Sequence, residues 1–304
     1  MRIPHRVIRI DRERPGHRPD RLRTESRRAR RAASLHVSVG NRFGFKSRNH
    51  TDEKIMAAMN EMLGNDLLRA LPDEQRRHLL PRFDRVTLPT GYVISDAALR
   101  PTHVYFLTAS VVSLHHVLKD SFSAEFAIVG CEGAVGLDAM FNNRHSADRV
   151  VVLQGGSALR IDKRALKWEF FRSQGLQQTL MRYAWSLMGL VAQTAVCNRH
   201  HCLDQRLCRW LLLAQDRLPG NQLVVTQQFL SDLLGVRREG VTHAVGRLQR
   251  AGLIRHRRGH VTIVDRVGLE AGACECYETA RRTVAPSRVN DLRWRVSAAQ
   301  PILV

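Results

Sequence analysis

Short runs of apolar residues, separated by turn-forming residues, fill the stretch between about Leu67 and Phe171. The runs lie at 85–88, 92–94, 104–107, 111–114, 126–129, 150–153 and 158–161. Many short apolar runs at this spacing are typical of β-strands rather than helices. A set of this kind favours a closed or double-sheet arrangement such as a jelly-roll-like β-roll. We therefore predict an α+β chain whose N-terminal domain is a β-roll.

The period of the apolar positions changes after Phe171. Leu180, Leu187, Thr194 and His201 recur every seven residues, interleaved with Tyr183, Leu190 and Cys197. A heptad pattern of this kind marks the seam along which two long helices pair. We predict a dimerisation helix over 172–203, and its interface residues are Leu180, Tyr183, Leu187, Leu190, Thr194 and Cys197. The alternative is a helix that packs only on its own β-roll.

A helix-turn-helix pattern follows. The first helix is predicted over 227–234, with Thr226 suited to cap its start and Gly235 placed where a tight turn needs a positive φ. The second helix carries Val241, Val245 and Leu248 as one apolar stripe. The stripe leaves a polar face near the N-terminal end of this helix.

The polar face of the second helix carries residue types that contact DNA bases. Arginine binds the guanine edge in the major groove, glutamate accepts from the cytosine amine, and the N-terminal half of such a helix reaches the groove floor. The residues predicted for base readout are Arg238, Glu239, Thr242 and His243. The residues predicted to contact the DNA backbone are Thr226, Arg237, Arg247, Arg257, Arg258 and His260.

A short basic hairpin comes next. Residues 251–254 and the alternating residues 261–264 predict two strands around a tip that contains Gly259. A helix-turn-helix followed by such a hairpin is a winged helix, and its basic tip would lie against the DNA backbone. The apolar stripe and the glycine turn alone would fit any small three-helix domain, so the hairpin makes the pattern specific.

The segment Leu234 to Thr242, together with 252–254 and 259–263, resembles the DNA-binding domain of the Crp/Fnr superfamily of bacterial transcription regulators. Three upstream motifs, at 88–94, 104–107 and 130–136, resemble strands and turns of that family's sensor domain in the expected order. The resemblance covers about residues 65–284. It implies a homodimer that binds palindromic double-stranded DNA with its recognition helices about 34 Å apart. RNA polymerase is a further candidate partner.

The resemblance also bears on the ligand of the sensor domain. Cyclic-nucleotide-binding relatives hold the ribose with a Gly-Glu pair and the cyclic phosphate with an arginine followed by a small residue. Here Gly136 is followed by Leu137 and Asp138, and the second region reads His145 to Val150. We therefore expect a degenerate pocket that does not bind cyclic AMP, with Arg149 as the candidate effector contact.

The composition is strongly basic. The chain of 304 residues has a formal net charge of +20, which implies a polyanionic partner. Residues 1–50 hold 14 Arg and one Lys against four acids, and residues 204–262 hold ten Arg against four acids. A general basic nucleic-acid-binding protein is therefore the alternative function. No apolar run is long enough to span a membrane and no secretory core is present, so we expect a cytoplasmic protein.

Six cysteines raise the question of metal or redox chemistry. The spacings of Cys197, Cys202 and Cys208 place them on different helix faces, and two thiols of a C-x-C within a helix do not point the same way. We expect reduced, mostly buried thiols, no metal site, no cofactor and no catalytic residue. His200 and His201 are expected at an interface or a helix cap. The remaining alternative is a metal- or haem-dependent sensor or a cupin-like β-roll protein.

These patterns predict five parts. They are a disordered basic extension at 1–55, a sensor domain at 56–171, the dimerisation helix at 172–203, a winged helix-turn-helix domain at 204–284 and a loose tail at 285–304. The extension has three interpretations, which are a nucleic-acid-binding arm, a transit peptide, or coding sequence upstream of a start at Met56 or Met59. The last is favoured because the family-like part begins just after Met56.

Overall fold

The computed structural model describes residues 56, 58–96, 101–119, 123–141 and 148–284. All of them belong to one compact unit that begins at Lys46. The predictions for the basic extension, the C-terminal tail and His145 fall outside the described residues.

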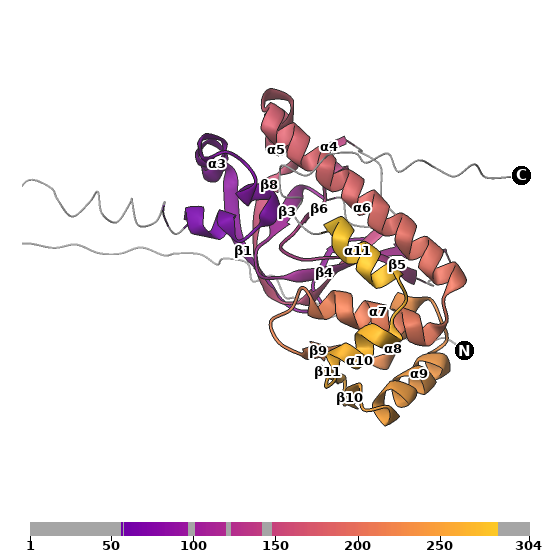
Figure 1. Ribbon diagram of the computed structural model, residues 1–304. Helices are drawn as coiled ribbons and strands as arrows, with labels where there is room; N and C mark the ends of the chain where they lie inside the picture. Colours follow the sequence, from indigo (N-terminus) through magenta and orange to yellow (C-terminus); the bar gives the residue numbers. More distant parts are fainter. Residues whose placement is uncertain (1–55, 57, 97–100, 120–122, 142–147, 285–304) are drawn as a thin grey trace, which may run out of the picture. The chain divides into compact units, whose positions relative to one another are not determined.

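Two four-stranded antiparallel sheets build the N-terminal domain (Figure 1). In the first, the order is β1 (Phe83–Leu88), β8 (Gly156–Asp162), β3 (His103–Leu107) and β6 (Ala134–Val135). In the second, it is β2 (Val93–Ser95), β7 (Asp148–Gln154), β4 (Val111–Val117) and β5 (Ser123–Val129). Every predicted apolar run falls on one of these strands, apart from Tyr92 just before β2. The α+β fold class with a double-sheet β-roll is confirmed.

Short helices pack against the first sheet. They are α2 (Asp66–Arg69), α3 (Asp73–Leu79), the 3-10 turn η1 (Leu80–Arg82), α4 (Asp138–Phe141) and α5 (Lys163–Arg172). Asn65 joins α2 to the sheet domain, because its buried side chain caps the helix through Oδ1 and donates from Nδ2 to the carbonyls of Leu107 and Gly133, both at 2.8 Å. One amide side chain thus satisfies both the helix start and two loop carbonyls.

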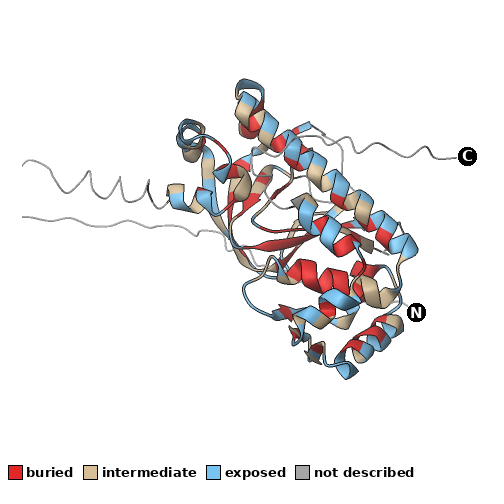
Figure 2. Ribbon diagram, in the orientation of Figure 1, coloured by how far each residue is buried: buried red, intermediate tan, exposed pale blue. Residues whose placement is uncertain are grey.

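The long helix α6 (Gln174–His200) runs across the unit (Figure 1). Buried and exposed positions alternate along α6 (Figure 2). The side chains predicted as a dimer seam lie on the face that α6 presents to its own chain: Leu180, Tyr183, Leu190, Thr194 and Cys197 are buried, and Leu187 is half-buried. The predicted set of dimer-interface residues is therefore wrong. The heptad pattern was real, but it marks the intramolecular core.

The opposite face of α6 is apolar and exposed. Met181, Trp185, Met188 and Val196 are 60%, 73%, 55% and 52% exposed. At 100° per residue, these positions and Ala192 lie about half a turn around the helix from the buried face. We call Met181, Trp185, Met188, Ala192 and Val196 the outer stripe of α6.

The C-terminal domain contains α7 (Leu203–Gln215), α8 (Gln227–Leu234), α9 (Arg238–Arg250), α10 (Arg266–Gly272) and α11 (Cys276–Val284). Its antiparallel sheet has the order β10 (Ile254–Arg257), β11 (His260–Ile263) and β9 (Gln222–Val224). The sequence predicted α8, α9 and the hairpin, but not β9. Since β9 pairs with β11, it extends the wing into a three-stranded sheet.

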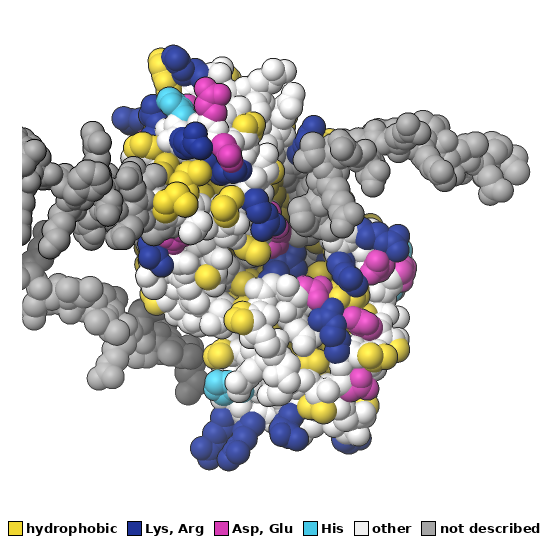
Figure 3. All heavy atoms as spheres, turned by 60° about the vertical axis from the view of Figure 1, so that its left-hand side comes forward, with side chains coloured by type: hydrophobic (Ala, Val, Ile, Leu, Met, Phe, Trp, Pro, Cys, Tyr) yellow, Lys and Arg dark blue, Asp and Glu magenta, His cyan; other side chains and the backbone are white. Residues whose placement is uncertain are grey.

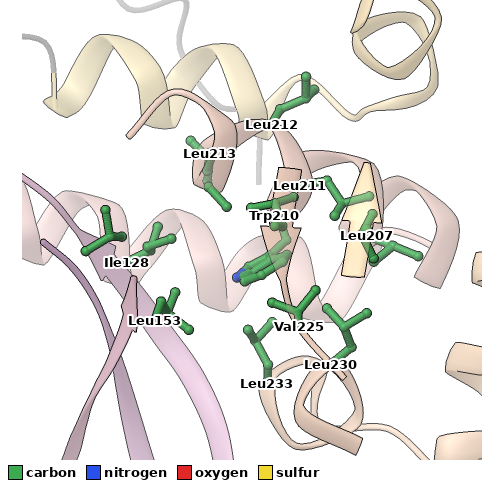
Figure 4. Close-up of a cluster of buried hydrophobic side chains, with 14 of the residues drawn as sticks. Ile128, Leu153, Leu207, Trp210, Leu211, Leu212, Leu213, Val225, Leu230 and Leu233 are labelled. Carbon is green, nitrogen blue, oxygen red and sulfur yellow. The ribbon is translucent and has the colours of Figure 1, made fainter. Parts of the chain in front are cut away.

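One buried cluster spans the two domains. Ile128 of β5 and Leu153 of β7 lie beside Trp210 and Leu213 of α7, and Leu230 of α8 lies in the same cluster (Figure 4). Continuous burial of this kind favours a fixed orientation of α7 on the β-roll.

Candidate nucleic-acid interface

A three-residue turn sets the angle between α8 and α9. Thr226 caps α8 by accepting from the amide of Phe229 at 3.1 Å, and Gly235 ends it in the left-handed region at φ 63°. The hydroxyl of Ser231 donates to the carbonyl of Val236 at 2.6 Å and holds the turn. The cap and the glycine turn match the expectation from sequence.

Helix α9 has one buried and one exposed face. Val241, Ala244, Val245 and Leu248 are buried. The four residues predicted for base readout, Arg238, Glu239, Thr242 and His243, are all exposed on the other side. The structure thus brings them together on one accessible face, and their contact with bases stays a prediction.

Thr242 also connects the two helices of the motif. Its hydroxyl lies 2.9 Å from Oε1 of Gln227, the first residue of α8, and 3.0 Å from the carbonyl of Arg238. Sequence analysis missed Gln227, because a polar residue in a first helical turn gives no signal for a partner 15 residues away. The exposed face therefore includes a side chain from α8 that orients Thr242.

The wing carries positive charge at its tip. β10 and β11 pair from Ile254 opposite Ile263 to Arg257 opposite His260, and the tip residues Arg258 and Gly259 have φ values of 44° and 81°. Two successive positive φ values are typical of the type I′ turn that connects tight hairpins. Arg257, Arg258 and His260 are exposed. Figure 3 shows Lys and Arg side chains gathered at this end of the molecule.

Arg247 differs from the other predicted backbone contacts. Its guanidinium makes a bidentate ion pair with Asp204 at the start of α7, with Nε and Nη2 both 2.6 Å from carboxylate oxygens. A phosphate would have to displace Asp204 to bind this group. Thr226, just before α8, and Arg237, just before α9, are both exposed.

The candidate effector residue Arg149 lies exposed on β7, opposite His115 of β4 in the strand register. Burial, with the positive charge of Arg149 acting in the same direction, lowers the pKa of His115 to about 4. Residues 142–147, which come just before β7, lie outside the described residues. The role of Arg149 toward an effector stays a prediction.

A buried polar network joins the second sheet to α7. Glu125 of β5 accepts from the indole Nε1 of Trp210 at 2.8 Å and from the hydroxyl of Ser113. The same hydroxyl lies 2.7 Å from Nε2 of His115. Burial raises the pKa of Glu125 to about 7, although its hydrogen bonds from Ser113 and Trp210 oppose that rise. Sequence analysis did not single out any of these residues.

A second polar contact joins the two domains. Arg217, just after α7, donates from Nε to Glu132 at 2.6 Å, and their side chains are only 5% and 12% exposed. An ion pair so far removed from water depends on both partners being present. The DNA-binding domain is thus attached to the β-roll through Glu125 and through Glu132.

Residues 205–271 match the family described as the Crp-like helix-turn-helix domain. This stretch contains α8, α9 and both strands of the wing. The chain is therefore a DNA-binding regulator with a Crp-like helix-turn-helix domain. The family resemblance and the general function predicted from the sequence are therefore confirmed.

Several solved structures share the fold of this regulator. A Crp/Fnr-family protein from Eubacterium rectale is 17% identical, with a TM-score of 0.57 over 67% of this chain and 96% of its own. FixK2 from Bradyrhizobium japonicum is 14% identical, with a TM-score of 0.53 over 63% of this chain and 98% of its own. A Crp/Fnr-family regulator from Thermus thermophilus is 19% identical, with a TM-score of 0.51 over 62% of this chain and 98% of its own. No curated protein matches significantly. At these identities the structures establish the fold and nothing finer.

No helix among the described residues of this regulator is long and apolar enough to cross a membrane.

The cysteines of the regulator are arranged differently from the prediction. Cys274 precedes α11 and Cys276 is its first residue, so the C-x-C pair is not inside a helix and both thiols turn toward the end of α6. There they meet Cys197 and His201, and the ligand atoms of all four residues lie within 4.8 Å of one another. The prediction that helix geometry keeps the cysteines apart is wrong for this group. His201 follows the last residue of α6, as its predicted place at a cap requires.

Proposed function

We propose that this regulator acts as a homodimer that binds a palindromic DNA site in the cytoplasm, under the control of its β-roll sensor domain and without catalytic activity. The observation that carries the proposal is the outer stripe of α6. It lies in the same chain as a recognition helix whose four polar residues face solvent.

The outer stripe has the spacing of a helix-pairing surface. Its residues follow one another at intervals of four, three, four and four, which is close to the alternation of a coiled-coil seam. An exposed apolar stripe that includes a tryptophan is unusual for a monomer and marks an interaction site. A second copy of α6 presents the same stripe, and a twofold axis along the helix pair covers both.

A dimer of this kind explains what a single recognition helix does not. One helix contacts only a few base pairs, whereas two helices related by a twofold axis and about 34 Å apart contact two half-sites one DNA turn apart. The selected site is then an inverted repeat. RNA polymerase is the proposed downstream partner.

Control by the sensor domain requires a physical connection. The contacts of Glu125 with Trp210 and of Glu132 with Arg217 support such a connection, because each joins the β-roll to the segment that carries the winged helix. A ligand that shifts β5 or the turn around Glu132 would change the position of α7. Arg149 is the proposed contact for an anionic effector.

The decisive experiment combines mass and sequence preference. Light scattering on the full chain should give twice the monomer mass, and selection from a random DNA pool should give an inverted repeat with two equal half-sites. A monomeric mass with a single half-site would overturn the dimer. Equal affinity for the selected site and for bulk DNA would instead favour the general nucleic-acid binder.

A further inference from the structure

Four potential metal ligands converge where the long helix meets the DNA-binding domain. Cys197 and His201 stand four residues apart at the end of α6, which places them on one side of that end. Cys274 and Cys276 come from the segment that begins α11. The two pairs are brought together across 77 residues of chain between Cys197 and Cys274.

The distances in this cluster suit one tetrahedral ion. The Sγ atoms of Cys197 and Cys274 are 3.6 Å apart, and Sγ of Cys276 is 3.5 Å from Nδ1 of His201. Zinc bonds of about 2.3 Å to sulfur and about 2.0 to 2.1 Å to nitrogen give tetrahedral edges of about 3.8 Å between two sulfurs and about 3.5 Å between sulfur and nitrogen. These two separations agree with those edges, and all four ligand atoms lie within 4.8 Å of one another. Ligands so close together leave no room for a cluster of several iron atoms.

The surroundings orient these ligands. The other ring nitrogen of His201, Nε2, lies 3.4 Å from a carboxylate oxygen of Glu275. A carboxylate at that nitrogen fixes the tautomer that leaves Nδ1 free to bind a metal. The amide Nε2 of Gln193 donates to Sγ of Cys276 at 2.9 Å. Both are the outer contacts that metal-bound histidine and cysteine commonly have.

The charge around the cluster also suits a thiolate site. Three thiolates around a divalent ion leave one net negative charge. Arg209 is buried, donates from Nη2 to Thr194 at 2.8 Å, and lies close enough to act electrostatically on Cys197. A buried cation beside the thiolates offsets that negative charge.

We propose that Cys197, His201, Cys274 and Cys276 bind one Zn²⁺ ion. Three thiolates and one imidazole at tetrahedral spacing form the closed donor set of structural zinc sites, and soft sulfur donors exclude Mg²⁺ and Ca²⁺. Only His201 and Cys202 separate α6 from α7, so the ion lies at the hinge between the long helix and the winged-helix domain. It ties the segment before α11 to the end of α6.

Metal content of the intact protein tests the proposal first. The full chain, purified under reducing conditions without chelator, should contain about one zinc per chain. Metal-stripped protein should bind Co²⁺ with the ultraviolet charge-transfer absorption of thiolate coordination and the visible bands of a tetrahedral site. Zinc far below stoichiometry, together with no such cobalt spectrum, would overturn the proposal.

Variants and thiol labelling locate the metal. Cys276→Ser should lose the bound zinc, whereas Cys202→Ser, which changes an exposed thiol next to His201, should keep it. Glu275→Gln should weaken zinc binding about 10- to 100-fold without abolishing it. In wild-type protein, stripping the metal should increase alkylation of Cys197, Cys274 and Cys276 but not of Cys202. Unchanged zinc in Cys276→Ser, unchanged labelling on stripping, or a Cys197 to Cys274 disulfide in the reduced preparation would each contradict the site.

Discussion

The indole Nε1 of Trp210 donates a 2.8 Å hydrogen bond to Oε1 of Glu125, and this bond crosses from the DNA-binding domain to the sensor sheet. Both side chains are buried. A buried carboxyl group stays uncharged up to a higher pH than usual, because burial penalises its ionised form. Glu125, which connects the two domains through this hydrogen bond, is therefore also a group that binds a proton.

Glu125 should make the stability of the protein fall as the pH rises through neutrality. Burial raises its pKa from 4.5 to about 7. A carboxyl group whose pKa is higher in the folded than in the unfolded state stabilises the fold at pH values below its unfolded pKa. This contribution is lost as the pH rises from about 4.5 to about 7. Relative to Glu125→Gln, the wild-type protein should lose about 2 to 3 kcal/mol of unfolding free energy between pH 5 and pH 8.

Urea denaturation at a series of pH values measures this difference. The groups facing Glu125 are Ser113, Trp210, Arg209 and Arg217, and His115 lies one hydrogen bond further away. His115 acts in the opposite sense, because its pKa falls to about 4 and its contribution is lost as the pH drops below 6.5. The Glu125→Gln variant retains His115, so the contribution of His115 is the same in both proteins and drops out of the difference between them. Parallel pH profiles for wild type and variant would contradict the prediction, and exposed Glu278→Gln is the control.

Replacing Trp185 by aspartate should convert the dimer to a monomer. The substitution places two carboxylates at the proposed twofold interface, where desolvation and like-charge repulsion oppose association. The affinity for an inverted repeat should fall with it, while the fold stays intact because Trp185 is 73% exposed. Val267→Asp, which changes an equally exposed apolar residue on α10, should leave the mass unchanged. Light scattering and circular dichroism give the result.

Arg238 and Glu239 should each specify one base pair in every half-site. Arg238→Ala should cost about 1 to 3 kcal/mol per half-site and relax the preference at one symmetric pair of positions. Arg258→Ala, at the tip of the wing, should weaken binding to all sequences equally. Selection from a random DNA pool separates these effects. An unchanged motif after Arg238→Ala and Glu239→Ala would show that the recognition-helix register is wrong.

The Arg217 to Glu132 pair should show strong coupling. A double-mutant cycle with Arg217→Met and Glu132→Gln should give about 1 to 3 kcal/mol of interaction free energy, because the pair is shielded from solvent. The exposed pair Arg282 and Glu278, 2.9 Å apart on α11, serves as the reference and should give about 0.5 kcal/mol or less. Equal coupling in the two cycles would contradict a role for burial.

Local signals made the DNA-binding helices predictable. Thr226 and Gly235 mark the two ends of α8 by hydrogen bonding and backbone conformation within the segment itself, and the structure has its bounds at 227 and 234. The alternation of apolar residues likewise located the strands of the β-roll. In each case the deciding interaction is between near neighbours in the chain or follows from the strand pleat.

The errors came from contacts that join distant parts of the chain. Along α6, the series of Leu180 and Tyr183 and the series of Met181 and Trp185 both have helical spacing, and spacing alone does not say which face the rest of the chain covers. Cys197 and Cys274 are 77 residues apart, so only the docking of α11 against α6 brings them together. β9 was missed because three residues carry too little periodicity.

The ion pair between Arg247 and Asp204 changes how the ionic atmosphere of the DNA should respond to this protein. An arginine displaces a condensed counterion only when its charge is free to neutralise a phosphate. Because Arg247 already has a carboxylate partner, its contribution to the salt dependence of binding is reduced. The formal charge of residues 204–262 therefore overstates the number of counterions that each half-site releases.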